Sequence, residues 1–343
     1  MAMLNVLQFD NENLKRRLLF TYRRGKGRFL KYFLNRFQWN YFAKYHILSS
    51  KPPHIDIEPT SICNMSCPMC FTNFTDVNRN GFMDLSLYKK IIDDAAELGI
   101  FSVRLSHRGE PLLHKNYLEM VSYAKKKGIP EVSTLTNGLL LDKEMIQGLF
   151  DAGLDWLNIS IDGVGSAYES IRRPAKFADI EEKVKFAHAL RTQRKMVRPI
   201  IWVQSIWSAV EKNPAEYINK FSPYVDKIAF HVDNDYANKF EKEPSWVCHR
   251  LWHRMMILWD GRVPLCNSDF ECKNQIGDMR RQTIKEVWLG EEMQKARELN
   301  LKKQRLKLIP CDDICNWGNK RVWKTVVIDG KEQRILSQVL KDK

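Results

Sequence analysis

Residues 54–70 read His-Ile-Asp-Ile-Glu-Pro-Thr-Ser-Ile-Cys-Asn-Met-Ser-Cys-Pro-Met-Cys, a short apolar run followed by three cysteines, Cys63, Cys67 and Cys70. Three residues separate the first pair and two separate the second. This spacing holds three thiolates close enough to bind three irons of a [4Fe–4S] cluster, and it leaves the fourth iron without a protein ligand. An open iron binds a small molecule, so the motif predicts chemistry rather than a structural staple.

Two other interpretations of the motif are weaker. Zinc ribbons use two close pairs of cysteines, and a three-then-two spacing is unusual for them. Disulfide bonds are typical of short secreted chains, whereas this chain has 343 residues and starts without a basic-then-apolar leader. We therefore expect a reducing compartment, the cytoplasm.

The motif resembles that of the radical S-adenosylmethionine (SAM) superfamily, and the resemblance covers roughly residues 52–320. It implies that the open iron binds the amino and carboxylate groups of SAM. Reductive cleavage then yields a 5′-deoxyadenosyl radical that takes a hydrogen atom from the substrate, while the protein orients the reactants. A flavodoxin or ferredoxin is the usual reductant in this superfamily.

Strand and helix patterns alternate after residue 53, which predicts an α/β fold with a parallel sheet and right-handed crossovers. The resemblance implies a partial (β/α)6 TIM-like barrel. Active sites of such sheets lie at the carboxyl ends of the strands, where the cysteines fall. The expected strands are 54–58, 101–106, 131–136, 156–161, 200–206 and 227–231, and the expected helices are 85–98, 117–127, 143–152, 180–190 and 214–221.

Segments after these strands resemble the SAM-binding segments of the family. Arg108-Gly109-Glu110 stands where relatives have a Gly-Gly-Glu-like turn, so Arg108 departs from the pattern. Gly109 lets the backbone approach closely, and Glu110 is expected to accept from the methionyl ammonium. A guanidinium fork suits the SAM carboxylate. The other expected cofactor contacts are Thr136, Asn137, Ser160 and Asp162, together with Arg172 or Arg173 for the carboxylate.

Two histidines near strand ends, His107 and His231, are candidate catalytic residues in the substrate cavity. The alternative is that each is a hydrogen-bonded residue of the cavity wall. His107 directly precedes the Arg-Gly-Glu turn and is the better candidate, and Glu58 on the first strand is a candidate supporting residue.

Five further cysteines lie between residues 248 and 315. Together with an Asp260-Gly261 turn and a helix expected over residues 283–299, which starts with a Thr283–Glu286 capping box, their order resembles the auxiliary-cluster region called SPASM, or its shorter form, twitch. The full form typically has seven cysteines, so five favour one auxiliary [4Fe–4S] cluster. Four thiolates leave no open iron, which suits electron transfer; zinc is the alternative occupant. The expected ligands are Cys248, Cys266, Cys311 and Cys315.

The fifth cysteine of this group, Cys272, has several possible roles. The first role is to replace Cys248 as a cluster ligand. The second is to pack as an inert free thiol. The third is to donate a hydrogen atom to a substrate radical. The donor role would make the protein an epimerase.

The first fifty residues carry ten basic and two acidic side chains, a net +8 out of +14 for the whole chain, and they are rich in aromatic residues. Apolar residues recur there at helical spacing, which predicts an amphipathic helix. Either its aromatic side packs on the main domain with a solvated basic rim, or it contacts a membrane surface. No nucleic-acid partner is expected.

The predicted division is a basic helical segment 1–50, a barrel 51–235, a twitch/SPASM-like domain 236–320 and a tail 321–343.

These features together predict a radical SAM oxidoreductase that acts on a sugar, aminocyclitol or anionic glycan-type metabolite. Net oxidation would deliver an electron to the auxiliary cluster. The alternatives are an epimerase that uses Cys272 and a maturase of a ribosomal peptide. A different class, a non-catalytic iron–sulfur or zinc protein that binds nucleic acid, rests on the basic first fifty residues alone.

Overall fold

The computed structural model describes residues 6–8, 14–77, 80–231, 233, 236, 241–312, 315, 317–319, 321–328 and 331–338. Residues 1–5 and 9–13 of the predicted N-terminal segment, and 339–343 of the predicted tail, lie outside the described residues.

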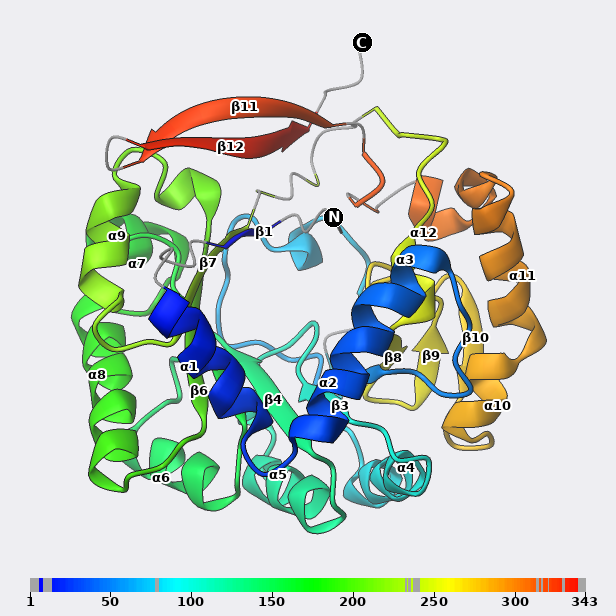
Figure 1. Cartoon of the computed structure of the whole chain (residues 1–343), viewed down its shortest axis with the longest axis horizontal. Helices are drawn as coiled ribbons and strands as arrows, with labels where there is room; N and C mark the ends of the chain where they lie inside the picture. The colour runs from blue at the N-terminus through cyan, green and yellow to red at the C-terminus, as the bar shows by residue number, and fades with distance from the viewer. Residues whose placement is uncertain are drawn as a thin grey trace.

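A curved parallel sheet, with helices on its outer side, forms the body of the molecule (Figure 1). All six predicted strands are present and lie side by side in chain order, so the predicted α/β partial barrel is confirmed. They are β2 His54–Ile57, β3 Ser102–Leu105, β4 Glu131–Thr136, β5 Trp156–Ser160, β6 Ile200–Ile206 and β7 Lys227–His231.

Two short strands that the sequence did not predict extend the sheet at its edges. β8 (Met255–Ile257) pairs parallel to β2, and β1 (Val6–Gln8) pairs antiparallel to β7. The seventh parallel strand thus comes from the region predicted as the auxiliary-cluster domain. Ion pairs also attach β8 to the sheet. The buried Asp56 carboxylate of β2 contacts Arg254 beside β8 at 3.3 Å and Arg104 of β3 at 2.8 Å.

The helices begin and end where local sequence signals place them. Side chains of Asp84 and Asp142 accept hydrogen bonds from the first turns of α4 and α6, and Gly128 follows α5 with a φ of +86°. The helices of the barrel are α4 Leu85–Glu97, α5 Tyr117–Lys126, α6 Lys143–Asp151, α7 Ser166–Ile171, α8 Phe177–Gln193 and α9 Pro214–Phe221.

Two N-terminal helices, α1 (Leu14–Gly25) and α2 (Phe29–Phe37), lie against the amino-terminal ends of the barrel strands (Figure 1). A π-helical turn, Gln38–Phe42, and the short α3, Ala43–Tyr45, continue the chain. Arg24 forks onto Glu131 of β4 with bonds of 2.8 and 3.1 Å. Two further arginines pair with acids that precede strands, Arg28 with Asp155 at 3.0 Å and Arg23 with Asp226.

This orientation matches one interpretation of the N-terminal segment only in part. Aromatic side chains were expected to pack inward with a solvated basic rim. Phe20 does pack on Trp156, but Phe29, Phe33 and Phe37 are exposed while arginines face the barrel. The reason is electrostatic. Acids stand at the amino-terminal ends of β4, β5 and β7, and a buried carboxylate requires a paired cation.

The C-terminal region is built from short elements. One helix was expected over residues 283–299, but Gly290, with a ψ of 160°, divides it into α10 (Ile284–Leu289) and α11 (Glu291–Leu301). The Thr283–Glu286 capping box is present. The other elements are β9 Arg262–Pro264, β10 Gln275–Asp278, α12 Ile309–Asp312, β11 Arg321–Ile328 and β12 Lys331–Gln338.

The last two strands form an antiparallel hairpin above the barrel in Figure 1. Residues 329 and 330 lie outside the described residues, but their sequence, Asp-Gly, is a hairpin signal within the predicted tail. None of the described helices is long and apolar enough to cross a bilayer.

Candidate active site

The three-cysteine loop directly follows β2 at the carboxyl end of the sheet. The Cys67 carbonyl accepts from the Cys70 N–H at 3.0 Å and from Asn73 Nδ2 at 2.9 Å, which closes the loop into a tight turn. The thiol of Cys63 interacts electrostatically with that of Cys70, and the thiol of Cys67 with both, so the three sulfur atoms lie near one another. Burial raises the pKa of the Cys63 and Cys67 thiols.

The Gly109-Glu110 turn packs directly against this loop. A Cβ on Gly109 would lie 2.3 Å from the Ile62 carbonyl oxygen and 2.5 Å from that of Thr60, so only glycine fits there. The Glu110 N–H donates to the Ile62 carbonyl at 2.8 Å. The turn after β3 therefore fixes the backbone immediately before Cys63.

The Glu110 carboxylate is buried and oriented by the end of β4. It accepts from Thr136 Oγ1 at 2.6 Å, from the Asn137 N–H at 2.7 Å and from the Leu112 N–H at 3.2 Å. Burial raises its pKa, while these donors oppose the shift. The Asn137 amide donates to Asn64 Oδ1 at 2.8 Å and lies 3.9 Å from Cys63 Sγ. Thr136, Asn137 and Glu110 are thus brought together beside the first cysteine.

Arg108, the departure from the family pattern, is committed to contacts within the chain. Its guanidinium forks onto Glu58 with bonds of 2.6 and 2.5 Å, and it also donates to the Phe270 carbonyl at 2.8 Å. Both charged groups are almost fully buried. Arg108 therefore joins the end of β2 to the C-terminal region, and Glu58 holds it in place.

One of the two candidate arginines faces the cysteine loop. Asp162 accepts from Arg172 Nε at 2.6 Å and from the Ile206 N–H at 2.8 Å, so the carboxylate orients the guanidinium. Arg172 interacts electrostatically with Cys67 and with Glu110. Arg173 is exposed. The geometry therefore separates two residues that the sequence could not distinguish.

Both candidate histidines stand at strand ends, His107 just after β3 and His231 as the last residue of β7, and both are neutral. Burial lowers the pKa of His107 to about 3 and that of His231 to about 4. The His107 Nε2 atom is buried without a hydrogen-bond partner among the described residues, and its ring stacks on Phe270 at 6.0 Å between ring centres. His231 Nε2 lies 3.1 Å from Gln204 Oε1.

The sequence interpretation missed Gln204, the partner of this histidine, and Asn158, which bonds to Gln204. Gln204 of β6 accepts from Asn158 Nδ2 at 2.9 Å and donates to Ser160 Oγ at 3.4 Å, while Asn158 Oδ1 is buried without a partner among the described residues. Asn158, Ser160 and Gln204 occupy alternate positions of buried strands. Polar residues at alternate positions of an otherwise apolar strand were the signal that could have identified them.

The second group of thiols forms at the start of the C-terminal region. Cys248 and Cys266 interact electrostatically with each other and with Cys315, and Cys311 interacts with all three. Burial raises the pKa of Cys248 to about 11 and also raises those of Cys266 and Cys311. The four cysteines expected to act together are thus assembled from segments 67 residues apart in the sequence.

Cys272 lies apart from these four. It packs with Met256 and Leu258 in a small buried cluster separate from the main core, and its backbone has a φ of +56°. Burial, with Asp269 nearby, raises the pKa of its thiol to about 12, so the sulfur carries its proton at neutral pH.

Both donor sets fit iron–sulfur clusters. Within the described residues, no three His, Cys, Asp or Glu side chains form a group that could hold a single metal ion. The two sets consist of cysteine thiols alone, three after β2 and four in the C-terminal region, which is the donor type that [4Fe–4S] clusters take.

Comparison with known families agrees with the geometry. Residues 57–201 match the radical SAM superfamily, and residues 248–316 match an iron–sulfur cluster-binding domain, SPASM. The chain therefore contains a radical SAM domain followed by a C-terminal SPASM domain. A radical SAM domain binds a [4Fe–4S] cluster and SAM, and a SPASM domain binds auxiliary iron–sulfur clusters.

Curated relatives match the chain over part of its length. A Fe-coproporphyrin III synthase of Methanosarcina barkeri is 33% identical over 36% of this chain and 30% of its own. A tungsten-containing aldehyde ferredoxin oxidoreductase cofactor-modifying protein of Pyrococcus furiosus is 31% identical over 45% of this chain and 43% of its own. The matched segments thus span less than half of these relatives.

Solved structures share the fold. BtrN in complex with AdoMet and 2-DOIA superposes with a TM-score of 0.54, at 21% identity, over 77% of this chain and 93% of BtrN. SuiB of Streptococcus suis bound to the precursor peptide SuiA superposes with a TM-score of 0.54, at 14% identity, over 74% of this chain and 68% of SuiB. These similarities support the partial barrel and its C-terminal extension.

Proposed function

We propose that the protein is a radical SAM oxidoreductase whose substrate is a sugar, an aminocyclitol or an anionic glycan-type metabolite. The observation that carries this proposal is the contrast between the two thiol groups. Three interacting cysteines follow β2 and would leave one iron open for SAM, whereas four interact in the C-terminal region and would close a single auxiliary cluster. When bound, the first cluster and SAM supply hydrogen abstraction, and the closed cluster accepts the electron that remains on the substrate.

Residues of this chain would orient SAM from two sides. Glu110, held by Thr136 and Asn137, would accept from the methionyl ammonium of SAM. Arg172, held by Asp162, would bind its carboxylate. Arg108 is better described as a positioning residue, because Glu58 and the Phe270 carbonyl occupy its donors.

Neutral polar side chains near the strand ends would bind a polar, uncharged region of the substrate. The free Nε2 of His107 and the free Oδ1 of Asn158 offer hydrogen bonds from neutral groups, as hydroxyl recognition requires. His231 is a wall residue in this proposal, because Gln204 occupies its Nε2 atom.

A second candidate function, epimerisation, is favoured by Cys272. Its thiol is protonated, and it packs with Met256, which lies opposite Asp56 in the β8–β2 pair. A protonated thiol near a substrate radical would donate its hydrogen atom to the carbon and become a thiyl radical. An electron from the reduced auxiliary cluster and a proton would then restore the thiol, so no net oxidation would occur.

Anaerobic reconstitution tests both candidates. We expect about eight irons per chain and release of 5′-deoxyadenosine with dithionite, since two [4Fe–4S] clusters are bound. Zinc without SAM cleavage would contradict the proposal.

The Cys272→Ala variant then separates the two reactions: oxidation predicts an unchanged product, and epimerisation predicts loss of product with both clusters intact. A cross-linked or cyclised peptide product would favour the maturase alternative.

The cellular setting follows from the same chemistry. All eight cysteines are free thiols, which is typical of a reducing compartment, and we propose the cytoplasm. A flavodoxin or ferredoxin is the proposed reductant.

A further inference from the structure

The outward side of the two N-terminal helices is an unusually apolar surface. Leu30 is 75% exposed, Leu18 61% and Phe33 54%. We call this surface the hairpin face, after the helical hairpin that α1 and α2 form and not after the β11–β12 hairpin. It is defined by the exposed side chains Leu18, Tyr22, Leu30, Phe33, Phe37 and Tyr41. Contiguous apolar patches on soluble proteins mark interaction sites.

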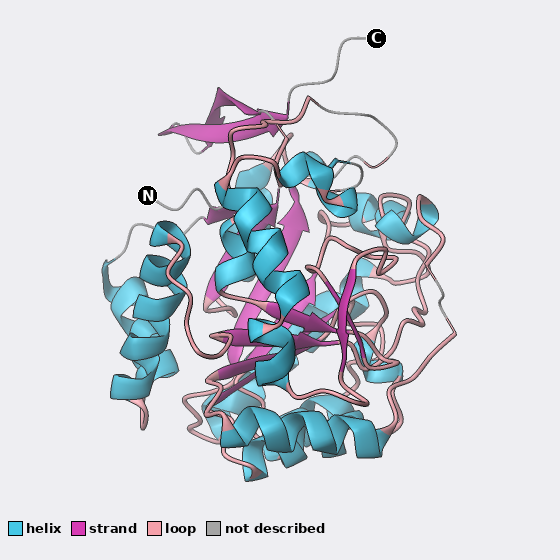
Figure 2. Cartoon of the chain, turned by 90° about the vertical axis from the view of Figure 1, so that its right-hand side faces the viewer, coloured by secondary structure: helices cyan, strands magenta, loops and turns pink. Residues whose placement is uncertain are grey.

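The hairpin face is continuous along α1 and α2. Tyr22 contacts Phe29 across the two helices, with ring centres 6.3 Å apart, and Phe29 lies 6.3 Å from Phe33. One turn further on, Phe37 stacks on Tyr41 at 4.9 Å. The helices form the outermost layer on the left side of Figure 2. The rings are exposed while arginines of the same helices pair with acids of the barrel, so the rings lie on the outward side.

The inward side of the same helices is firmly attached. Arg24 is bound to Glu131 and Arg28 to Asp155, and Asn35 Nδ2 donates to the Pro53 carbonyl at 2.9 Å. Rotating the helices to bury the rings would break these ion pairs and leave the Glu131 and Asp155 carboxylates buried without a cation. The exposure of the hairpin face is therefore built into the fold.

Charge around the hairpin face identifies the occupant. The sequence contains no Asp or Glu between Glu12 and Asp56. Lys26, Lys31 and Lys44 are exposed on this segment. Lysine is depleted in protein–protein interfaces, whereas lysines beside exposed Leu and Phe are typical of helices that lie in the surface of an anionic bilayer.

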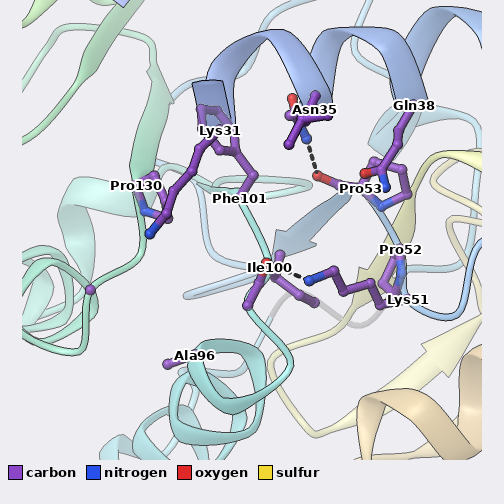
Figure 3. A pocket seen from close by; sticks show the side chains of 13 residues that line it. Lys31, Asn35, Gln38, Lys51, Pro52, Pro53, Ala96, Ile100, Phe101 and Pro130 are labelled. Atoms are coloured by element: carbon purple, nitrogen blue, oxygen red, sulfur yellow. Dashed lines mark hydrogen bonds between the residues drawn. The ribbon is translucent and has the colours of Figure 1, made fainter. Parts of the chain in front are cut away.

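A groove beside α2 adds to this arrangement. It has a volume of about 400 Å³ and lies between α2 and the loops that precede β2, β3 and β4 (Figure 3). Lys31 extends across it toward Pro130, and Leu34, Ile100 and Phe101 contribute apolar walls. The groove thus places a cation and apolar surface together at the edge of the hairpin face.

We propose that the hairpin face docks the protein on the surface of a bilayer that contains anionic lipids. The leucine and phenylalanine side chains enter the interfacial region, and the lysines lie at the level of the lipid phosphates. The cysteine loop is at the opposite ends of the barrel strands, so the SAM-binding end faces away from the bilayer. This inference does not depend on the proposed reaction.

Vesicle co-sedimentation of the anaerobically purified full chain tests the proposal. We expect binding to vesicles of phosphatidylcholine mixed with phosphatidylglycerol, and weaker binding to phosphatidylcholine alone. The double variant Leu30→Ser/Phe33→Ser should weaken binding at least roughly tenfold, since each removes several buried carbon atoms from the interface. Lys31→Gln should weaken it roughly fivefold, and only on anionic vesicles.

Leu301→Ser is the matched control. Leu301 is 51% exposed on α11, outside the hairpin face, and its replacement should leave vesicle binding unchanged. Release of 5′-deoxyadenosine by the Leu30→Ser/Phe33→Ser variant should match that of the wild type, which separates a failure of docking from a failure of the proposed reaction. Binding that is absent from both vesicle types would overturn the proposal. So would a wild-type dimer that Leu30→Ser/Phe33→Ser converts to monomer without any change in vesicle binding.

Discussion

The structure explains why Arg108 stands where the family pattern has a glycine. A second glycine at this position would leave the buried Glu58 carboxylate without its cation. The guanidinium instead satisfies both carboxylate oxygens and a carbonyl of the C-terminal region. Arg108 therefore lacks the backbone freedom of a glycine, but its contacts join the end of β2 to the C-terminal region.

Replacement of this arginine should be strongly destabilising. Arg108→Ala leaves the Glu58 carboxylate buried and unpaired, and we expect a loss of about 3–5 kcal/mol in the free energy of unfolding. Urea unfolding under anaerobic conditions measures it. The matched control is Arg280→Ala, which removes an ion pair to Asp278 whose arginine side chain is 58% exposed and should have no measurable effect. Equal effects of the two variants would contradict the structural role of Arg108.

Gly109 should be essential for the first cluster. In Gly109→Ala the new methyl group meets the backbone oxygens of Thr60 and Ile62, so the cysteine loop must move. We expect iron content to fall by about four per chain, with the auxiliary cluster retained. The control Gly148→Ala meets only the flexible side chain of Leu118 and should retain all its iron. Full iron content in Gly109→Ala would show that the loop tolerates the displacement.

At the scale of elements, the N-terminal helices are attached by arginines at the amino-terminal ends of strands. Although burial alone would raise the pKa of Glu131, Arg24, Arg36 and Arg28 lower it to about 2. This carboxylate therefore contributes stability that is complete above its unfolded pKa of 4.5 and is lost as the pH falls from there toward 2.

The pH dependence of one variant tests this attachment. Arg24→Ala should lower the free energy of unfolding by about 3–5 kcal/mol at neutral pH, because Glu131 loses its forked partner. The difference from the wild type should shrink as the pH falls below about 4.5. Urea unfolding of both proteins across this range measures it, with Lys26→Ala, an exposed neighbour, as the control. A difference that stays constant with pH would exclude Glu131 as the cause.

At the scale of the whole molecule, the barrel and the C-terminal region act as one unit. β8 continues the sheet, Arg254 reaches the Asp56 carboxylate, and Arg108 reaches the Phe270 carbonyl. These contacts fix the position of the four-thiol group relative to the three-cysteine loop. A fixed separation is what electron transfer from a substrate radical to the auxiliary cluster needs.

Removal of one auxiliary ligand should therefore separate cofactor cleavage from product formation. In Cys266→Ala we expect about four irons per chain instead of about eight, since only the three-cysteine cluster remains. Release of 5′-deoxyadenosine should persist, while the oxidised product is lost. Iron analysis and product chromatography measure the two effects. Oxidised product from a variant that has lost the auxiliary cluster would contradict the proposed electron route.

Much of this protein followed from the sequence. The six strands, their order and the cysteine loop after the first of them were predicted, because burial in a parallel sheet imposes apolar runs and the helix ends carry their own signals at Asp84, Asp142 and Gly128. The thiol spacing in residues 63–70 and the family resemblance named the cofactors.

Other features were decided only by the tertiary structure. The sequence could not choose between Arg172 and Arg173, because the choice depends on which guanidinium folds back onto Asp162, ten residues earlier and just after β5. It could not show that Cys272 lies apart from the other four thiols, or that Met255–Ile257 joins the barrel sheet. The orientation of α1 and α2 depends on acids more than a hundred residues away. Local patterns determine elements, whereas long-range pairing of buried charges determines which face of an element meets the protein and which meets its surroundings.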